Sequence, residues 1–409
     1  VPTARLGNVN TAGLEDDIAL LGFKVASNGS LAKYNLVDQT VDAFEDDSGV
    51  DASASTNEVR DSSNYYSGYV AGTISTLTTD NFYTTKTGTW TPSVTGDAEI
   101  LLVAGGGGGA QSQGSSTSHY GGAGGGGGIV HHTAYAVVSG VEYDISVGRG
   151  GSRDTPSGDV GTNSVFNINA EGSGATMTAI GGGGGGNPNV NGTDGGSGGG
   201  AGWNASSTRA GGSATQGDSA GGTGYGNDGS GAASSYAGGG GGAAAAASGS
   251  VTGGAGKLFA TFNQYGTDSS NDAAVGTNGG YFGGGGGAAP SGVGGVGGGG
   301  DGPTSGPAQG SAGPDKTGGG GNGSWSEEGG SGRGGFFGVL SPSTGQNMTL
   351  VSTTTAAQAA PTKGDIVLTY TSSVGSTTLD TDLTAEISAD GGSTWTALPL
   401  GSEGSTGSH

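Results

Sequence analysis

Histidine offers the most versatile chemistry in this sequence, because it can ligate metals and carry protons near neutral pH. The sequence has four histidines: His119, the adjacent pair His131 and His132, and the terminal His409. The pair falls in a predicted strand, where adjacent side chains point to opposite faces. The two imidazoles are therefore not expected to chelate one ion, and the sequence predicts no metal site.

The other patterns that usually carry catalysis are missing or stand in the wrong context. The absence of cysteine excludes disulfides, thiolate metal sites and cysteine nucleophiles. No G-x-S-x-G motif lies between a strand and a helix. The glycine-rich loops lack the Lys-Ser/Thr of a phosphate-binding loop, and no helix follows them as dinucleotide binding requires. The sequence predicts no catalytic residue, no cofactor-binding residue and no cofactor, and therefore a protein that is not an enzyme.

One acidic group allows two interpretations. Glu45, Asp46, Asp47 and Asp51 could offer hard oxygen ligands to calcium. A solvated acidic loop explains the same residues, and we favour it.

Charge and composition limit the possible partners. The chain has 34 acidic against 12 basic residues, a net charge of −22. Such a field repels nucleic acids and anionic membranes, and no apolar run reaches the roughly 20 residues of a membrane span. We expect no nucleic acid and no membrane insertion.

The N-terminal region contains the helical patterns of the sequence. Leu14, Ile18, Leu21 and Val25 share one face of a helix, and a second set, Leu36, Val37, Val41 and Phe44, has similar spacing. We interpret residues 1–50 as a helical oligomerisation or attachment segment, with a homotrimer as the preferred assembly. Residues 51–84, rich in Ser, Asn, Asp and Tyr, are interpreted as a linker.

Several segments have the composition of β-strands. The clearest is the apolar run 98–103, and 133–138 and 142–147 flank a Ser139-Gly140 turn. Residues 165–168, 176–180 and 365–370 are further predicted strands.

Runs of glycine separate these strands. Glycine makes up 100 of the 409 residues, without a G-x-y period, and many of the polar segments between the runs end in an aromatic residue. A disordered tract is one interpretation. A flexible linker does not need spaced aromatic residues, so we favour extended helices with three residues per turn, packed side by side through glycine.

The order of strands and glycine runs resembles the glycine-rich domain of phage tail fibres, adhesins and bacterial surface proteins. The resemblance rests on residues 99–109, 124–129, 140–148 and 364–370. It implies a mainly β fold: a β-sandwich that carries a bundle of polyglycine II-type helices over residues 85–372, preceded by the short helical segment.

Two smaller resemblances accompany it. Residues 198–204 are similar to the glycine-rich extracellular region of anaplastic lymphoma kinase-type receptors, but that region is disulfide-bonded and this chain has no cysteine. Residues 13–21 and 36–44 resemble segments in large structural proteins of marine phages, which implies a virion appendage.

Residues 388–395 fit the pattern S-x-D-x-G-x-T-W. This motif resembles the Asp-box of sialidase-like propellers, where it stabilises a hairpin away from the catalytic centre. Asp390 is expected to bond the turn backbone, with Trp395 packed beneath it. Because a propeller needs repeats and only one copy occurs, residues 373–409 are interpreted as the start of a C-terminal β module.

We therefore predict a structural or adhesive protein, extracellular or on a virion surface, and first of all a phage tail fibre that contacts its host. The alternative is a non-viral extracellular filament or matrix protein without a specific receptor. The expected partners are a host-surface glycan or protein and other virion or filament subunits. The candidate recognition residues are Trp203, Asn204, Tyr225, Tyr236, Tyr281, Phe282 and Trp325; aromatic caps on the glycine segments are the competing interpretation.

Overall fold

The computed structural model divides the chain into two compact units. One comprises residues 71–344, and the other combines residues 1–70 with residues 345–409. The structure describes residues 33–36, 39–42, 49–60, 66–67, 69–70, 72–79, 84–112, 119–153, 156–172, 174–204, 208–233, 235–249, 251–270, 279–304, 313–325, 328–345, 347–354, 356, 366, 368, 370 and 376–402.

The larger unit is built on a five-stranded antiparallel sheet with the order β15-β10-β8-β18-β6. The predicted strand 98–103 is confirmed within β8, at the centre of the sheet, where the side chains of residues 100–103 are fully buried. An apolar run without alternation suits this position, because both faces of the strand are covered. The bounds are β6 Ile74–Thr78, β8 Gly96–Val103, β10 Ile129–Val137, β15 Thr223–Tyr225 and β18 Phe336–Leu340.

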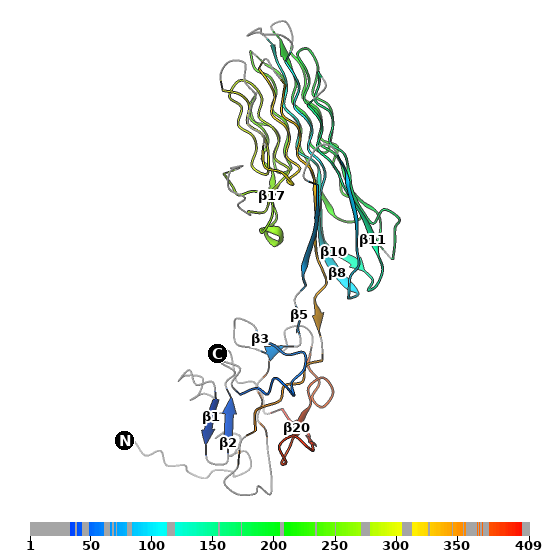
Figure 1. The fold of residues 1–409 in the computed structure, drawn as a ribbon, viewed down its shortest axis with the longest axis vertical. Coiled ribbons are helices and arrows are strands. Elements are labelled where there is room, and N and C mark those ends of the chain that lie inside the picture. The colour runs from blue at the N-terminus through cyan, green and yellow to red at the C-terminus, as the bar shows by residue number, and fades with distance from the viewer. Residues whose placement is uncertain are drawn as a thin grey trace, which may run out of the picture. The chain divides into compact units, whose positions relative to one another are not determined.

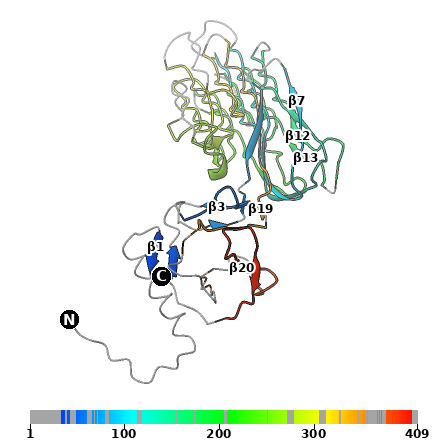
Figure 2. The same ribbon diagram turned by 60° about the horizontal axis from the view of Figure 1, so that its bottom comes forward.

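A four-stranded antiparallel sheet shares a hydrophobic core with the first. Its order is β13-β12-β11-β7, and its core residues include Tyr143, Phe166 and Met177, packed with Ile100 and Phe337 of the five-stranded sheet. Figure 2 shows β7, β12 and β13 together on one side of this unit. The sequence predicted three of the four strands to within two residues. The bounds are β7 Lys86–Trp90, β11 Tyr143–Val147, β12 Ser164–Phe166 and β13 Met177–Ala179.

The opposite face of the five-stranded sheet has its own core. Leu101 and Val103 alternate along β8 with the residues of the first core, and they pack with Phe259, Phe262 and Phe282. These phenylalanines come from a segment that contains β16 Lys257–Leu258, the short 3-10 helix η1 Ala260–Phe262 and β17 Tyr281–Phe282. Figure 1 shows the helix, in green, below β17.

Beyond the sheets, the glycine segments run side by side (Figure 1). Successive N–H groups of residues 104–111 bond to three different neighbours in turn, at 2.8 to 3.1 Å. Every third residue donates to the same neighbour: Ala104, Gly107 and Ala110 to residues 122–128; Gly105, Gly108 and Gln111 to residues 156–162; and Gly106 and Gly109 to residues 330–333. Residues 121–128 repeat the pattern towards residues 180–186, 318–324 and 238–241. This period of three differs from the period of two in a strand.

Close backbone contact explains why these segments are glycine. A Cβ atom on Gly107 would lie 2.0 Å from the Gly183 carbonyl oxygen, and one on Gly124 would lie 2.0 Å from that of Gly107. Any side chain there would push neighbouring segments apart. The segments are packed through their backbones, and their N–H groups are satisfied without side chains.

The smaller unit contains short hairpins and bridges. The second predicted helix, over Leu36 to Phe44, is wrong where the structure describes it: Leu36 lies in β1 and residues 39–42 form β2, and the two strands are paired. The predicted first helix, over Leu14 to Val25, lies outside the described residues. Isolated bridges join Val50 to Ser352 and Thr56 to Thr349. The bounds are β1 Lys33–Leu36, β2 Gln39–Asp42, β3 Val59–Arg60, β4 Tyr66–Ser67, β5 Tyr69–Val70, β19 Thr344–Gly345, β20 Ala385–Ile387 and β21 Thr396–Leu398.

Two boundaries differ from the predicted ones. The closing strand is β18, which lies next to β8, whereas Ile366, Leu368 and Tyr370 of the predicted strand are exposed and outside any strand. The predicted linker contains β6, an edge strand of the five-stranded sheet. Backbone pairing determines both boundaries, because β18 pairs with β8 on one side and with β6 on the other. Gly338 interrupts the apolar pattern of β18 but not its pairing.

The described part of the chain is mainly β and has almost no helix. Of the helices it contains, none is long and apolar enough to cross a membrane.

Candidate functional site

The glycine segments have two distinct ends. Residues 104–110 continue from the sheet after Val103. Residues 121–128 run antiparallel to residues 104–110 and rejoin the sheet at Ile129. We call the end near Val103 and Ile129 the sheet end, and the opposite end, where Tyr120 lies, the Tyr120 end. The segment 283–288 begins after Phe282, at the sheet end, and reaches Ala288, which packs in one cluster with Tyr120. The structure therefore separates the predicted recognition residues into two groups.

Three predicted residues lie at the sheet end. Phe282 is fully buried in the second core, so its side chain offers no surface to a ligand, and its place among the recognition residues is corrected. Tyr225 packs edge-on against Phe259, and the Lys257 Nζ lies 5.0 Å from the centre of its ring. Tyr281 is partly buried within the two-residue ladder of β16 and β17.

The remaining predicted residues gather at the Tyr120 end around an aromatic cluster of Tyr120, Trp203 and Trp325. Tyr120 stacks on Trp203 with the ring centres 5.2 Å apart, and Trp325 meets the Tyr120 ring edge-on, also at 5.2 Å. A short antiparallel ladder between β9 His119–Tyr120 and β14 Trp203–Asn204 fixes the first pair. Both tryptophans remain partly exposed, whereas Tyr120 is buried.

Alanine supports the aromatic cluster from below. Ala123, Ala237, Ala288 and Ala289 are buried at the Tyr120 end of their segments and pack against the three rings. At these positions the segments carry small side chains in place of glycine. The aromatic cluster thus packs against alanines whose segments are joined by backbone hydrogen bonds.

Polar side chains surround the aromatic cluster. Asn204 is buried and its amide donates a hydrogen bond to the Asn189 side-chain oxygen, while the Arg209 Nε donates to the Asn189 carbonyl oxygen at 2.6 Å. Tyr236 is 43% exposed. Burial, and secondarily the nearby Tyr236, raises the pKa of the Tyr120 phenol above its usual range.

Sequence reasoning left Tyr120 out of the recognition set, although it forms the centre of the aromatic cluster. A sequence signal was available, since Tyr120 ends a polar segment directly before a glycine run. The sequence could not show that three distant rings meet.

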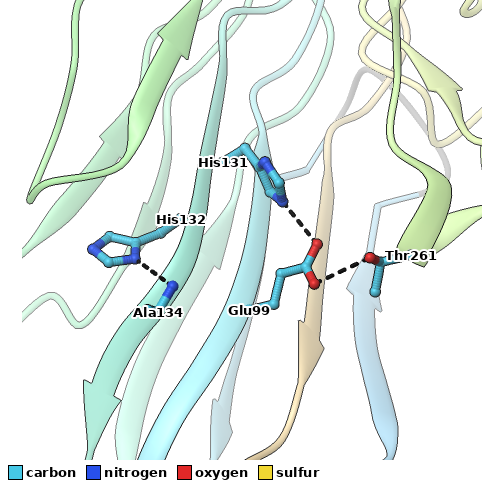
Figure 3. A network of polar contacts seen from close by, with 5 residues as sticks. All are labelled: Glu99, His131, His132, Ala134 and Thr261. Carbon is cyan, nitrogen blue, oxygen red and sulfur yellow. Dashed lines mark hydrogen bonds and ion pairs between the residues drawn. The ribbon is translucent and has the colours of Figure 1, made fainter. Parts of the chain in front are cut away.

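The histidine pair is arranged as predicted. Figure 3 shows His131 and His132 pointing away from each other. The His131 Nε2 is 2.8 Å from Glu99 Oε1, and the Thr261 hydroxyl donates to Glu99 Oε2 at 3.0 Å. His132 Nδ1 accepts a hydrogen bond from the Ala134 N–H, and burial lowers the pKa of its imidazole. Within the described ranges, no group of three or more potential ligands could hold a metal ion.

Of the acidic group considered for calcium, only Asp51 is among the described residues. Its Oδ1 accepts hydrogen bonds from the Ser53 N–H and hydroxyl, so it caps a local turn.

The Asp-box-like motif forms the expected turn between β20 and β21. The Asp390 carboxylate accepts hydrogen bonds from the Thr394 N–H at 2.8 Å and the Thr394 hydroxyl at 2.7 Å. Gly391 and Gly392 adopt φ values of 69° and 88°, where glycine is strongly favoured. The Trp395 indole N–H donates to the Gly392 carbonyl oxygen, so the side chain folds back over the turn.

This turn predicts a pH dependence. Hydrogen bonds from Thr394 lower the pKa of Asp390 to about 2, below the usual range of an aspartate. A carboxyl whose pKa is lower in the folded state stabilises the turn above its unfolded pKa, and this contribution is lost as pH falls towards 2. In an NMR titration of the folded chain, we expect the Asp390 carboxyl and the Thr394 amide to shift together with a midpoint near pH 2.

The control is Asp390→Asn, in which the Thr394 amide shift should no longer titrate over this range. A midpoint near pH 4 in the unaltered chain would show that the hydrogen bonds from Thr394 do not stabilise the carboxylate.

Comparison with known proteins gives one finding for the larger unit. A protein-family model described as a glycine-rich domain matches residues 83–340. The match extends from just before β7 to the end of β18, and it includes the glycine segments, the aromatic cluster and every strand of the two sheets except the edge strand β6. No curated protein matches the sequence.

Proposed function

Since the chain belongs to the glycine-rich domain family, we propose that it is a structural and adhesive protein whose packed glycine segments hold the aromatic cluster rigidly towards a surface. The observation that carries the proposal is the gathering of Tyr120, Trp203 and Trp325 at the end of the segments remote from the sheets. Partly exposed aromatic rings in a fixed arrangement suit recognition, because little conformational entropy is lost on binding.

The proposal includes the conformation of the glycine segments. We propose that they are polyglycine II-type helices, bundled on a β-sandwich formed by the two sheets. The period of three in their hydrogen bonds supports this conformation, which has three residues per turn and no internal hydrogen bonds. The contact between Gly124 and the Gly107 backbone supports bundling, since only glycine allows such an approach.

The setting that we propose is extracellular or on a virion surface, with a phage tail fibre as the first candidate. The net charge of −22 favours solubility and opposes binding to nucleic acid. Residues 1–50 would join the chain to sister chains, with a trimer as the preferred assembly, and to other virion or filament subunits. No catalytic step is assigned to the protein.

Attachment to intact cells tests the proposal. The labelled full chain should bind saturably to at least one member of a panel of bacterial and eukaryotic cells. Trp203→Ala should reduce this binding at least about tenfold, a change that corresponds to about 1.4 kcal/mol. Trp395→Ala, which removes an exposed tryptophan in the smaller unit, is the matched control and should bind normally.

Circular dichroism and thermal unfolding of each variant separate lost contact from lost folding. Saturable binding that Trp203→Ala leaves unchanged in a folded protein would place adhesion elsewhere. Filaments seen by electron microscopy, together with no binding to any cell, would instead favour the non-viral filament or matrix protein.

A further inference from the structure

Most segments at the Tyr120 end combine aromatic side chains with few charged residues. In the sequence, its segments 110–122, 187–191, 203–209, 232–237 and 288–292 contain only two residues that can carry a charge, His119 and Arg209. The Arg209 Nε is occupied by the Asn189 carbonyl oxygen. Two acidic residues, Glu327 and Glu328, follow Trp325 in the sequence, and Glu328 pairs with Arg153 at 3.4 Å. Charged residues are therefore few in the segments that carry Tyr120, Trp203 and Tyr236, and they are concentrated after Trp325.

We propose that the aromatic cluster, together with Tyr236 and the amides of Asn189 and Asn204, binds an uncharged glycan. This inference rests on the proposed adhesive function and specifies its ligand. A pyranose ring offers an apolar C–H face that can lie on an aromatic ring, and hydroxyl groups at its edge that need hydrogen-bond donors and acceptors. Trp203 and Trp325 supply the partly exposed rings, and Tyr236 supplies an exposed ring with a hydroxyl group.

Charge decides between ligands that could use the same rings. Nucleobases also stack on aromatic side chains, but nucleic-acid sites add a positively charged groove for the phosphates. An anionic glycan would likewise meet the long-range repulsion of a chain with a net charge of −22. A neutral saccharide avoids both costs, because its hydroxyl groups need amides and phenols rather than cations.

The support beneath the cluster favours a defined site. Ser324 accepts a hydrogen bond from the Ser112 N–H at 2.7 Å and donates one to the Ala110 carbonyl oxygen at 2.9 Å, so the segments on either side of Tyr120 and Trp325 are joined. His119 Nδ1 is a buried polar atom for which the described residues provide no hydrogen-bond partner. Fixed rings bordered by a few polar groups are typical of small-ligand sites.

Titration with defined saccharides tests the inference. The full chain is titrated with neutral hexasaccharides of glucose, mannose and N-acetylglucosamine, and with an acidic galacturonate hexasaccharide, by calorimetry and tryptophan fluorescence. At least one neutral hexasaccharide should bind, and the galacturonate should not. Tyr236→Ala and Trp325→Phe should each weaken binding about tenfold. Leu258→Ala removes a comparably exposed side chain at the sheet end and should leave it unchanged.

The outcomes separate this inference from the adhesive proposal. If no neutral hexasaccharide binds, if the galacturonate binds equally well, or if folded Tyr236→Ala and Trp325→Phe bind normally, the glycan inference is wrong. Cell attachment that Trp203→Ala still abolishes would then leave the adhesive function standing with a protein ligand. Hexasaccharide binding without attachment to any cell would support the glycan-binding inference and contradict the proposed adhesive function.

Discussion

Gly124→Ala is expected to destabilise the larger unit by about 3 kcal/mol or more, at the upper end of what overpacking costs. The added Cβ would lie 2.0 Å from the Gly107 carbonyl oxygen and 2.5 Å from its carbonyl carbon. No flexible side chain can move to make room, since the neighbours are backbone. Gly124 also donates to Gly321 and accepts from Gly286, so a shift disturbs bonds to further segments. Thermal and urea unfolding of the full chain measure the loss.

The matched control is Gly217→Ala. Apart from Gly217 and its two chain neighbours, nothing lies within 4 Å of a Cβ placed on Gly217, so this change should alter stability by less than about 1 kcal/mol. Equal unfolding midpoints for the two variants would contradict the close packing at Gly124. If Gly124→Ala does not fold, its soluble yield and circular dichroism beside those of Gly217→Ala give the same comparison.

Phe166→Ala is expected to cost about 3–5 kcal/mol, as for other buried aromatic residues truncated to alanine. Phe166 is fully buried between the two sheets. It stacks on Tyr143 and Phe337, with ring centres 5.6 and 5.4 Å away. Truncation removes both stacked contacts and leaves a cavity in the core that joins the sheets.

Urea unfolding followed by circular dichroism checks this value. Trp395→Ala removes a larger ring that is 45% exposed, and it serves as the control for loss of an aromatic residue as such. A loss below about 1 kcal/mol for Phe166→Ala would show that the two sheets do not depend on a shared core. The adhesive contact should be retained in any folded fraction, because Phe166 lies between the sheets rather than at the Tyr120 end.

Local patterns determined much of the β framework. The unbroken apolar run of β8 predicts burial on both faces, and Ser139-Gly140 predicts a tight turn, which the structure forms with Gly140 at a φ of 76°. The turn at Asp390 was equally predictable, because its hydrogen bonds join residues at most four positions apart. In each case the determining interactions are local or depend on composition alone.

Pairing between distant segments decided the rest. The set Leu36, Val37, Val41 and Phe44 has apolar spacing that fits a short helix as well as a strand, and the pairing of β1 with β2 settles the choice for the described residues. The closing strand is Phe336–Leu340 rather than residues 365–370, because its backbone fits between β6 and β8. Short apolar runs do not carry this information, since several of them satisfy the same pattern.

The sequence by itself determined that the glycine segments need backbone packing and that aromatic residues mark their ends. It could not determine which ends meet. Glycine runs are nearly identical to one another, so no side-chain pattern specifies which neighbour each one takes or in which register. Only the hydrogen bonds between segments bring Tyr120, Trp203 and Trp325 together, and the same packing buries Phe282 at the opposite end. The sequence shows which aromatic residues are available. The register of the glycine segments, which is set by backbone hydrogen bonds, determines that three of them form the candidate site.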